Sequence, residues 1–152
     1  SEEPKFKHIL LPTDGSNLAD RAIVRGMALA KTVGAKLTLL TVVPEFRMIA
    51  DESFAVPMSA ELKSRYEKEA KARAAKKLET VRQRMTRAGL KSDVVLIASD
   101  LPYQQIIAVA GKRKCDLVVM ASHGRRGLTG LLLGSETVKV LTHSKIPVLV
   151  VR

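Results

Sequence analysis

Five short apolar segments, separated by stretches with helical periodicity, constrain the fold of this 152-residue chain more than any other feature. Each segment is almost continuously apolar, which is typical of strands that are covered on both faces in a parallel sheet. Strands that alternate with helices predict an α/β sheet with helices on both faces. The predicted strands are residues 6–11, 36–43, 93–98, 116–120 and 146–151.

The segments between the strands predict four helices. Apolar and small residues recur at helical spacing from Ala19 to Val33, and Gly34 is placed to end that helix. A third helix begins at Pro102 and a fourth covers residues 131–143, whereas residues 45–59 show no clear period. The second helix is the longest, residues 60–88, and its predicted buried face consists of Leu62, Tyr66, Ala70, Ala74, Leu78, Val81 and Met85.

Length and composition favour a single domain over residues 1–152. No apolar run approaches the roughly 20 residues that span a bilayer. The first residues, Ser-Glu-Glu-Pro-Lys, do not resemble a signal peptide. The one cysteine, Cys115, cannot form an internal disulfide and is expected to be an inert core residue. We therefore expect a cytoplasmic protein without a membrane segment.

The net charge of +11 raises the question of a nucleic-acid partner. Much of the excess lies in residues 61–91, where 11 Lys or Arg residues stand beside 4 Asp or Glu residues. Aromatic residues are scarce, so no platform for stacking bases is evident. We expect no specific nucleic-acid partner and interpret the basic stretch as a solvated helix face. Salt-sensitive, non-specific association with polyanions stays open.

A glycine-rich loop lies between the predicted strand at 116–120 and the last helix. It contains Gly124, Gly127, Gly130 and Gly134, and Ser135 follows. Glycines allow close backbone approach, and a helix start offers unpaired N–H groups to an anion such as phosphate. A tight strand-to-helix turn without a ligand is the alternative. The loop fits neither the Walker sequence nor the dinucleotide fingerprint.

Nine residues separate Gly124 from Gly134-Ser135, and this spacing resembles the universal stress protein family. Nucleotide-binding members of that family carry Gly-x-x-Gly, nine residues, and then Gly-Ser or Gly-Thr. Ala121 stands here where the family has its first glycine. Residues 8–16 and 146–152 also resemble the family's first and last strands, so the resemblance covers nearly the whole chain.

The resemblance implies a Rossmann-like, open five-stranded parallel sheet in the order 3-2-1-4-5. In such a sheet, ligands bind at the carboxyl ends of the strands where the order reverses. The expected ligand is ATP with Mg²⁺, the ion lying near Ser135 rather than in a site made by protein groups alone. The implied nucleotide-binding residues are Pro12, Thr13, Asp14, Val42, Met120, Ala121, His123, Gly124, Arg125, Gly134, Ser135, Glu136 and Thr137.

Each of these residues also has a plainer interpretation. Asp14 accepts bonds from the nucleoside or caps its own turn, and Val42 packs on adenine or is ordinary core. Gly124 and Arg125 are expected to border the phosphates, or Arg125 is a solvated loop cation. The Ser135 and Thr137 hydroxyls hold phosphate or Mg²⁺, or Ser135 is only an N-cap. No nucleophile is evident beside His123, so proton transfer is not assigned to it. We expect His123 to shape the loop or to border the ligand.

The expected function is an ATP-binding regulatory protein of the universal stress type. One alternative is an enzyme, at most a slow ATPase, for which no catalytic residue is assigned. The other is a dimeric interaction module without a small ligand. We also expect a homodimer through the strand at 146–152, because an apolar edge strand invites pairing with its own copy.

Overall fold

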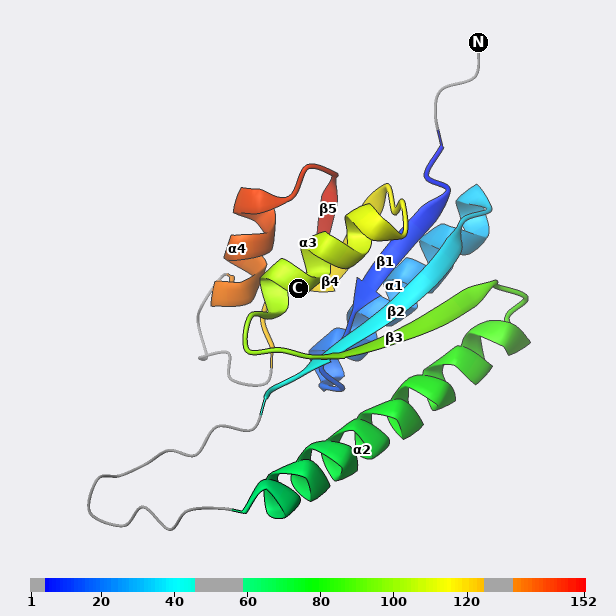
Figure 1. Ribbon diagram of the computed structural model, residues 1–152. Helices are drawn as coiled ribbons and strands as arrows, with labels where there is room; N and C mark the ends of the chain where they lie inside the picture. Colours follow the sequence, from blue (N-terminus) through cyan, green and yellow to red (C-terminus); the bar gives the residue numbers. More distant parts are fainter. Residues whose placement is uncertain (1–4, 46–58, 125–132) are drawn as a thin grey trace.

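The chain forms a parallel five-stranded sheet with helices on both faces. The computed structural model describes residues 5–45, 59–124 and 133–152 (Figure 1). The strand order is β3-β2-β1-β4-β5, and every neighbouring pair is parallel, which confirms the predicted order. The elements are β1 (His8–Pro12), α1 (Asn17–Val33), β2 (Lys36–Val43), α2 (Ala60–Arg87), β3 (Ser92–Ala98), α3 (Pro102–Lys112), β4 (Leu117–Ala121), α4 (Ser135–His143) and β5 (Val148–Val151).

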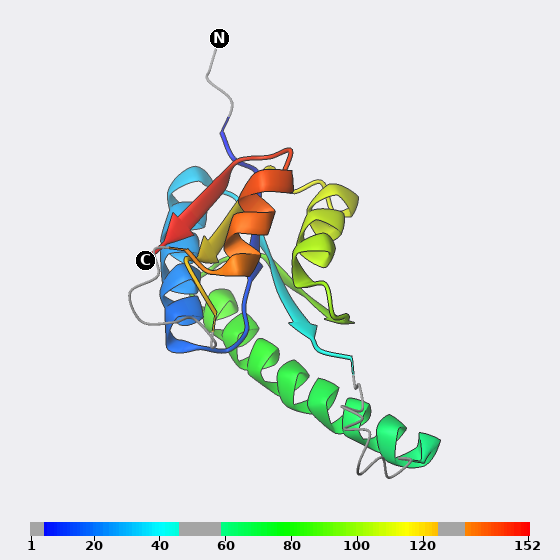
Figure 2. The ribbon, with the colours of Figure 1, turned by 90° about the vertical axis from the view of Figure 1, so that its left-hand side faces the viewer.

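Two hydrophobic clusters sandwich the sheet, because successive side chains of a strand point to opposite faces. On one face, Ile9 and Leu11 of β1 pack with residues of α1 and α2, among them Ile23 and Met85. On the other face, Leu10 packs with residues of α3 and α4. Figure 2, viewed along a direction 90° from that of Figure 1, separates the two helical layers. Residues 8–11 of β1 are therefore covered on both faces of the sheet.

Helix α1 packs very closely on the sheet, as its small residues predict. Ser16 caps its first turn by accepting a bond from the Ala19 N–H at 3.1 Å. Gly34 ends it in the left-handed conformation, with φ 75°. A side chain at Gly26 would collide with the Leu11 side chain, so glycine is required there by proximity.

The two edge strands differ from the prediction that all five strands are buried. In β3 and β5 most residues are only partly buried, and Leu149 is 43% exposed. The reason is their place at the sheet edges, where helices cover only part of each face. The strand limits also shift, since β1 begins at His8 and β5 at Val148, two residues later than expected in each case.

Helix α2 also departs from its predicted buried face. Leu78 and Met85 are buried, whereas Leu62 and Tyr66 are 54% and 48% exposed. The beginning of α2 extends past the sheet in both views, so the body of the domain cannot cover it (Figures 1 and 2). Within the described ranges, none of the helices has the length and apolarity needed to cross a membrane.

Candidate functional site

The candidate site lies where β1 and β4 end side by side. These strands are neighbours in the sheet, with Ile9 paired to Leu117 and Leu10 to Val118. From β1 the chain proceeds outward to β2 and β3, whereas β4 leads outward in the opposite direction to β5. The order of the sheet therefore reverses between β1 and β4, the place where ligands bind in sheets of this kind.

Asp14 and Gly124 meet in this crevice although 110 positions separate them. A Cβ atom placed on Gly124 would lie 2.8 Å from Asp14 Oδ2, so glycine lets the backbone approach this carboxylate without displacing it. The other carboxylate oxygen, Oδ1, accepts a bond from the Ser16 N–H at 2.9 Å. The turn-capping role of Asp14 is thus present, and Oδ2 lies beside Gly124.

Gly134 is required by packing within the protein. Its φ is −74°, which any residue can adopt. A Cβ atom there would lie 2.8 Å from the Cβ of His123 and 2.9 Å from its Cα. The Gly134 N–H also donates to the Ser122 carbonyl at 2.6 Å. This amide is therefore bound within the protein and does not face the crevice as a free donor.

The start of α4 supplies amides of the kind that bind anions. Gly134 is the N-cap and provides no side-chain cap, so the alternative that Ser135 is the N-cap is wrong by one residue. The first helical hydrogen bond from this turn is donated by the Val138 N–H to the Gly134 carbonyl, at 3.1 Å. The amides of Ser135, Glu136 and Thr137 precede it and have no acceptor within the helix. Together with the positive end of the helix dipole, they form an anion-binding geometry.

Two side chains that are predicted to meet the phosphates also have partners within the protein. The Thr137 hydroxyl, with the residue only 2% exposed, donates to the Ala121 carbonyl at 2.9 Å and ties α4 to the end of β4. Glu136 accepts a bond from the Tyr103 N–H at 3.0 Å and another from Lys139 Nζ at 3.2 Å. These side chains hold the helices in place around the crevice.

The carboxylate of Glu136 acts as an N-cap for α3, a role that the sequence pattern did not indicate. Leu101 precedes α3 and has no side-chain group that could cap it. A carboxylate at a helix N-terminus also interacts favourably with the dipole. The sequence signal for this role of Glu136 was Leu101. An apolar residue at the N-cap position cannot cap α3, so the cap has to come from another part of the fold.

Ser122 was also missed, and it organises the exit from β4. It is 2% exposed, its N–H donates to the Val151 carbonyl at 2.8 Å, and its own carbonyl accepts the Gly134 N–H. Its hydroxyl lies 3.1 Å from Nδ1 of His123. His123 therefore lies between β4 and the start of α4, consistent with a loop-shaping residue. No pattern in the sequence distinguishes Ser122.

The other predicted residues line the strand ends. The Thr13 N–H donates to the Leu40 carbonyl at 2.8 Å, and the Thr13 carbonyl accepts a bond from the Thr41 hydroxyl at 2.9 Å. Pro12 ends β1, and Val42 is partly buried against the second hydrophobic cluster. Met120 is 6% exposed and belongs to the same cluster, so its side chain is core. Arg125 lies outside the described residues.

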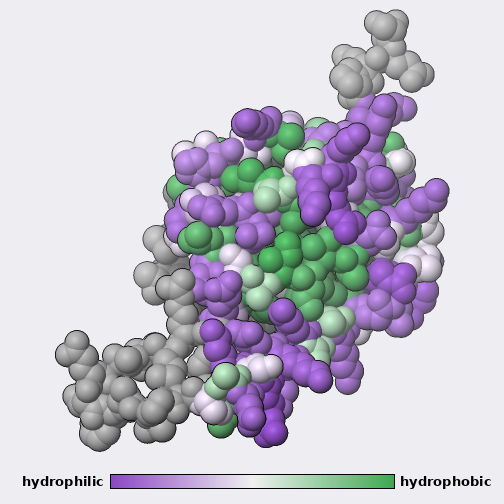
Figure 3. Space-filling view, viewed as in Figure 1, coloured by the Kyte–Doolittle hydropathy of each residue, from purple (hydrophilic) through white to green (hydrophobic). Residues whose placement is uncertain are grey.

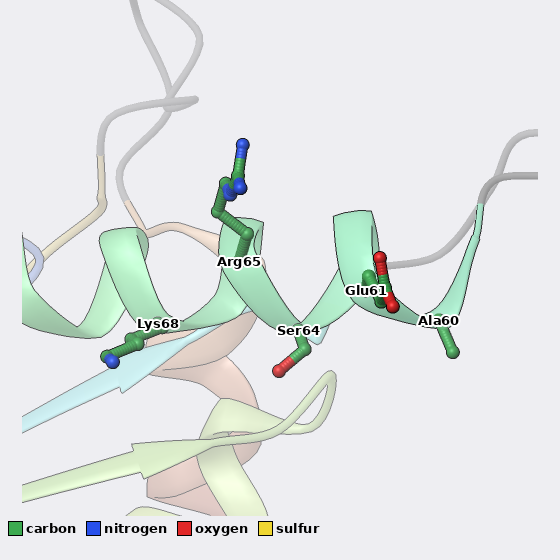
Figure 4. Close-up of a pocket in the computed structure, with 5 residues that line it drawn as sticks. All are labelled: Ala60, Glu61, Ser64, Arg65 and Lys68. Carbon is green, nitrogen blue, oxygen red and sulfur yellow. The ribbon is translucent and has the colours of Figure 1, made fainter.

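One hollow among the described residues lies away from these strand ends. Its volume is about 560 Å³, and its described lining comes from α2 alone. In Figure 4 the side chains of Arg65 and Ser64 point in opposite directions, so the lining does not converge on a ligand. No group of three or more His, Cys, Asp or Glu residues suited to a metal occurs in the described part of the chain. The hollow is lined by Ala60, Glu61, Ser64, Arg65 and Lys68.

The strand order defines a doubly wound α/β fold, in which the ends of β1 and β4 are the candidate ligand site. Residues 5–152 match the universal stress protein family, and the chain belongs to this family.

Characterised relatives match almost the full chain. The universal stress protein MJ0577 of Methanocaldococcus jannaschii is 29% identical over 160 residues, covering 97% of this chain and 95% of that protein. A universal stress protein of Thermus aquaticus is 33% identical over 147 residues, covering 97% and 99%. The solved structure of MJ0577 superposes with a TM-score of 0.83, covering 97% of this chain and 96% of that one.

More distant structures share the fold. A universal stress protein in complex with cAMP is 23% identical with a TM-score of 0.71, and the match covers 98% of each chain. A universal stress protein of Archaeoglobus fulgidus in complex with dAMP is 16% identical with a TM-score of 0.62, covering 98% and 100%. Some structural relatives of this protein therefore bind nucleotides.

Proposed function

We propose that this protein binds ATP with Mg²⁺ in the crevice between β1 and β4 and acts as a nucleotide-dependent regulatory protein of the universal stress family. The observation that carries the proposal is the approach of Asp14 to Gly124, beside a helix start whose first amides have no acceptor within the helix. A polar acceptor and an anion site in one crevice suit the two ends of a nucleotide. The proposal places the protein in the cytoplasm, where ATP is available.

The phosphate end of the ligand is assigned to the start of α4. The amides of Ser135, Glu136 and Thr137 offer donors to an anion, and the Ser135 hydroxyl adds an oxygen that suits phosphate or a phosphate-bound Mg²⁺. The Gly134 amide is not part of this set, because it already donates to Ser122.

The nucleoside end is assigned to Asp14 and Val42. Asp14 Oδ2 is an acceptor for ribose hydroxyls or for the adenine amino group. Val42 lies at the carboxyl end of β2 and is only partly buried, so it offers apolar surface to a base. Relatives with bound cAMP and dAMP, both adenine nucleotides, support adenine as the base.

Binding rather than rapid turnover is the proposed activity. Phosphoryl transfer to water needs a group that positions the water, together with charge stabilisation. Glu136 is bonded to Tyr103 and Lys139, and Asp14 Oδ1 is bonded to Ser16. These carboxylates therefore already serve the fold.

We expect ATP hydrolysis to take minutes or longer per turnover, measured as phosphate release. Phosphate release at about 1 per second or faster that copurifies with the protein would establish an ATPase instead.

The first experiment identifies the ligand. Protein purified without added nucleotide is denatured, and any released compound is identified by chromatography and mass spectrometry. ATP is the expected product, and calorimetry on the emptied protein should show MgATP binding. Absence of nucleotide together with absence of binding by calorimetry would favour an interaction module without a small ligand.

Two variants of Ser135 locate the phosphates. Ser135→Pro removes one N–H at the first helical position, where proline is tolerated, and Gly134 already has the extended conformation that precedes proline. A hydrogen bond to a charged group contributes about 1.5–3 kcal/mol, so ATP affinity should fall about 10- to 100-fold. Adenosine, which has no phosphate, should bind the parent and Ser135→Pro with equal affinity. The control, Ser135→Ala, keeps the N–H and isolates the contribution of the hydroxyl.

Asp14→Asn tests the nucleoside end. The amide oxygen can still accept the Ser16 N–H and preserve the turn, whereas Oδ2 is replaced by a donor. Adenosine and ATP should both bind more weakly, by about tenfold or more. The matched control is Asp93→Asn, the same change at the opposite end of the sheet, which should leave affinity unchanged. Equal effects of both variants would contradict the assignment.

A further inference from the structure

The amino ends of all five strands carry lysine. Lys36 is the first residue of β2, and Lys7 and Lys91 directly precede β1 and β3. Lys114 and Lys145 each stand three residues before β4 and β5. Because the strands are parallel, these starts lie along one edge of the sheet, opposite the candidate nucleotide site. We name the five residues, Lys7, Lys36, Lys91, Lys114 and Lys145, the strand-start lysines.

Backbone hydrogen bonds establish that the first three are neighbours. The Lys36 N–H donates to the Lys7 carbonyl at 3.0 Å, and the Leu37 N–H donates to the Lys91 carbonyl at 2.9 Å. Strands in a sheet lie about 4.8 Å apart, so five strand starts extend over about 19 Å. The result is a row of cations across the width of the sheet.

Other basic residues widen this row. Lys31 lies in the last turn of α1, and with Lys36 and Lys91 it lines a hollow of about 360 Å³ between the ends of α1 and α2. Lys112 and Arg113 end α3 on the other side of the sheet. Among the described residues at this end, outside α2, nine are basic and two are acidic, a net of +7. They are Lys5, Lys7, Lys31, Lys36, Lys91, Lys112, Arg113, Lys114 and Lys145, with Asp93 and Asp116.

Local structural needs do not account for this charge. Cations in the last turn of a helix interact favourably with the dipole, which explains Lys31 and Lys112. Four of the strand-start lysines stand two to four residues beyond the end of a helix, past the last turn over which this effect falls off, and Lys7 follows no helix in the described chain. Asp116 accepts the N–H groups of Lys7 and His8 and does not pair with a lysine side chain. In residues 5–45, 59–124 and 133–152, the strand-start lysines form no ion pair. Lys114 even has φ 55°, a conformation that favours glycine.

We propose that this amino-end surface binds the phosphate backbone of a nucleic-acid duplex without sequence specificity, independently of the nucleotide crevice. Lysine is a point charge that neutralises phosphate but reads no base pattern. The row of about 19 Å faces a polymer that carries one charge per about 1.7 Å. Single strands are not favoured, because Phe6, the aromatic residue beside Lys7, packs against the core cluster under α1 and α2 and does not offer a free face on which bases could stack.

An anionic membrane is the competing polyanion, and the surface suits it less well. Stable membrane association needs apolar groups that insert, in addition to basic charge. The described large apolar side chains that are exposed lie on helices, at Leu101 and Leu133 before α3 and α4, or within the edge strands, and none of them is the first residue of a strand. Figure 3 shows hydrophilic side chains along the upper and right margins, where the strands of Figure 1 begin.

The test compares two triple variants with equal loss of charge. Lys7→Gln/Lys36→Gln/Lys91→Gln removes the centre of the row. Lys63→Gln/Lys68→Gln/Lys71→Gln, the matched control, removes three exposed cations from the part of α2 that extends past the sheet. Binding of a fluorescent 25-base-pair duplex is followed by anisotropy between about 50 and 200 mM salt, after circular dichroism has shown that both variants fold.

For the parent, we expect a slope of log affinity against log salt of about −4 to −7, the value for five to eight neutralised phosphates. The row variant should reduce the magnitude of that slope by about 2 to 3 and weaken binding at least tenfold at 50 mM salt. The α2 variant should stay within threefold of the parent. MgATP, added at constant ionic strength, should leave duplex affinity unchanged.

Several results would overturn the proposal. Equal losses of duplex affinity in the two triple variants would mean that overall net charge or helix α2, and not the strand-start lysines, determines binding. Binding of vesicles with anionic lipid, but not of duplex, would identify a membrane surface. Competition by MgATP would place the duplex in the crevice. Each outcome is independent of the proposed ATP site, because that site is tested by the Ser135 and Asp14 variants at the other end of the sheet.

Discussion

At the amino end of β1, His8 is a buried histidine with both ring nitrogens in hydrogen bonds. Nδ1 lies 3.0 Å from the Arg113 carbonyl, and Nε2 lies 2.7 Å from the Thr38 hydroxyl. A carbonyl only accepts, so Nδ1 carries the hydrogen and the neutral ring accepts from Thr38 through Nε2. Burial and then the charge of Lys36 lower the pKa of His8 below its usual value of 6.5. The fold therefore prefers the neutral ring.

This preference predicts acid sensitivity. A lowered pKa in the folded state means that the stabilising contribution of His8 is complete above the unfolded pKa of about 6.5 and decreases as the pH falls below it. The free energy of unfolding, measured with urea, should therefore decline between about pH 6.5 and 5. In His8→Gln the part of the decline due to this ring should disappear. An unchanged slope in the variant would assign the effect to other groups.

At Gly134 the structure predicts an effect on stability that is separate from ligand binding. Gly134→Ala places a methyl group 2.8–2.9 Å from His123, including its backbone, so the chain must shift. Overpacking of this kind costs about 1–3 kcal/mol, which corresponds to a drop in Tm of about 2–12 °C. The control is Gly111→Ala in α3, where the new methyl meets nothing within 4 Å and Tm should hold or rise.

The same contact limits what Gly134→Val could reveal about ATP. A valine would collide with His123 before it reached any phosphate, so loss of binding in that variant would not locate the ligand. The Ser135 variants avoid this problem, because they change the first helical residue and leave the contact between Gly134 and His123 unaltered.

At the scale of single elements, α2 consists of two halves with different support. The second half buries Leu78 and Met85 against the sheet, whereas Leu62 near its start is 54% exposed. Ser59 caps the helix start by accepting the Leu62 N–H at 3.2 Å. Local capping and helix propensity therefore sustain the first half, and tertiary packing sustains the second.

We therefore predict that the same substitution, Leu→Ala, lowers the free energy of unfolding far more at position 78 of α2 than at position 62. Leu78→Ala should cost about 2–5 kcal/mol through lost burial and the cavity it leaves. Leu62→Ala should change the free energy of unfolding by less than about 0.5 kcal/mol. Urea denaturation of both variants measures the difference. Similar costs would show that Leu62 is covered in solution, for instance by another copy of the chain.

Strand β5 is the element on which we propose a homodimer. It lies at a sheet edge, and its residues Val148 to Val151 are all apolar. The Pro147 and Val151 carbonyls accept bonds from the β4 side, so the backbone groups of Val148 and Val150 face the open edge. Antiparallel pairing of two such edges would satisfy them and form a closed two-fold interface.

Val150→Pro tests this interface selectively. Proline removes the outward N–H while leaving the bonds to β4, which is how edge strands tolerate proline. Light scattering should give twice the chain mass for the parent and the chain mass for the variant. Val150→Thr keeps the N–H and the branched shape, and it should remain dimeric. A monomeric parent at micromolar concentration, or a dimeric proline variant, would contradict the proposal.

At the scale of the whole molecule, the two ends of the sheet differ in charge. The amino end is strongly basic, as described above, whereas Asp14, Glu45, Asp100 and Glu136 gather around the carboxyl ends of the strands. A polyanion and a nucleotide would therefore meet separate surfaces. Both surfaces are built on the same five-stranded sheet, so we expect a ligand at either end to stabilise the entire fold.

We predict that saturating MgATP raises Tm substantially. A ligand specific for the folded state adds about 2.7 kcal/mol at one hundred times its dissociation constant, which for a domain of this size is about 5–11 °C. Differential scanning calorimetry measures the shift, with adenosine as the control for the phosphate contribution. Ala121→Gly, which restores the family's glycine, should show an equal or larger shift. No shift in the parent would argue against an ATP site.

Much of the fold and part of the site follow from the sequence. Strands and helices are visible there because the periods of two and 3.6 residues are local properties of the chain. The strand order, and the meeting of Asp14 with the glycine loop, were available from the family resemblance and the reversal of the sheet. The helices and strands follow from the local residue pattern, and the strand order follows from the way strands and helices are connected in sheets of this kind.

Tertiary structure alone decided which groups remain available to a ligand. The bond from Gly134 to Ser122 removes one expected phosphate donor, and Glu136 is bonded to Tyr103, 33 residues away. The overhang of α2 and the exposure of β3 and β5 were likewise invisible, since a helical or apolar pattern is the same whether or not a neighbour covers it. Hydrogen-bond partners and burial are properties of the packed molecule, because they depend on which distant segments arrive at the same place.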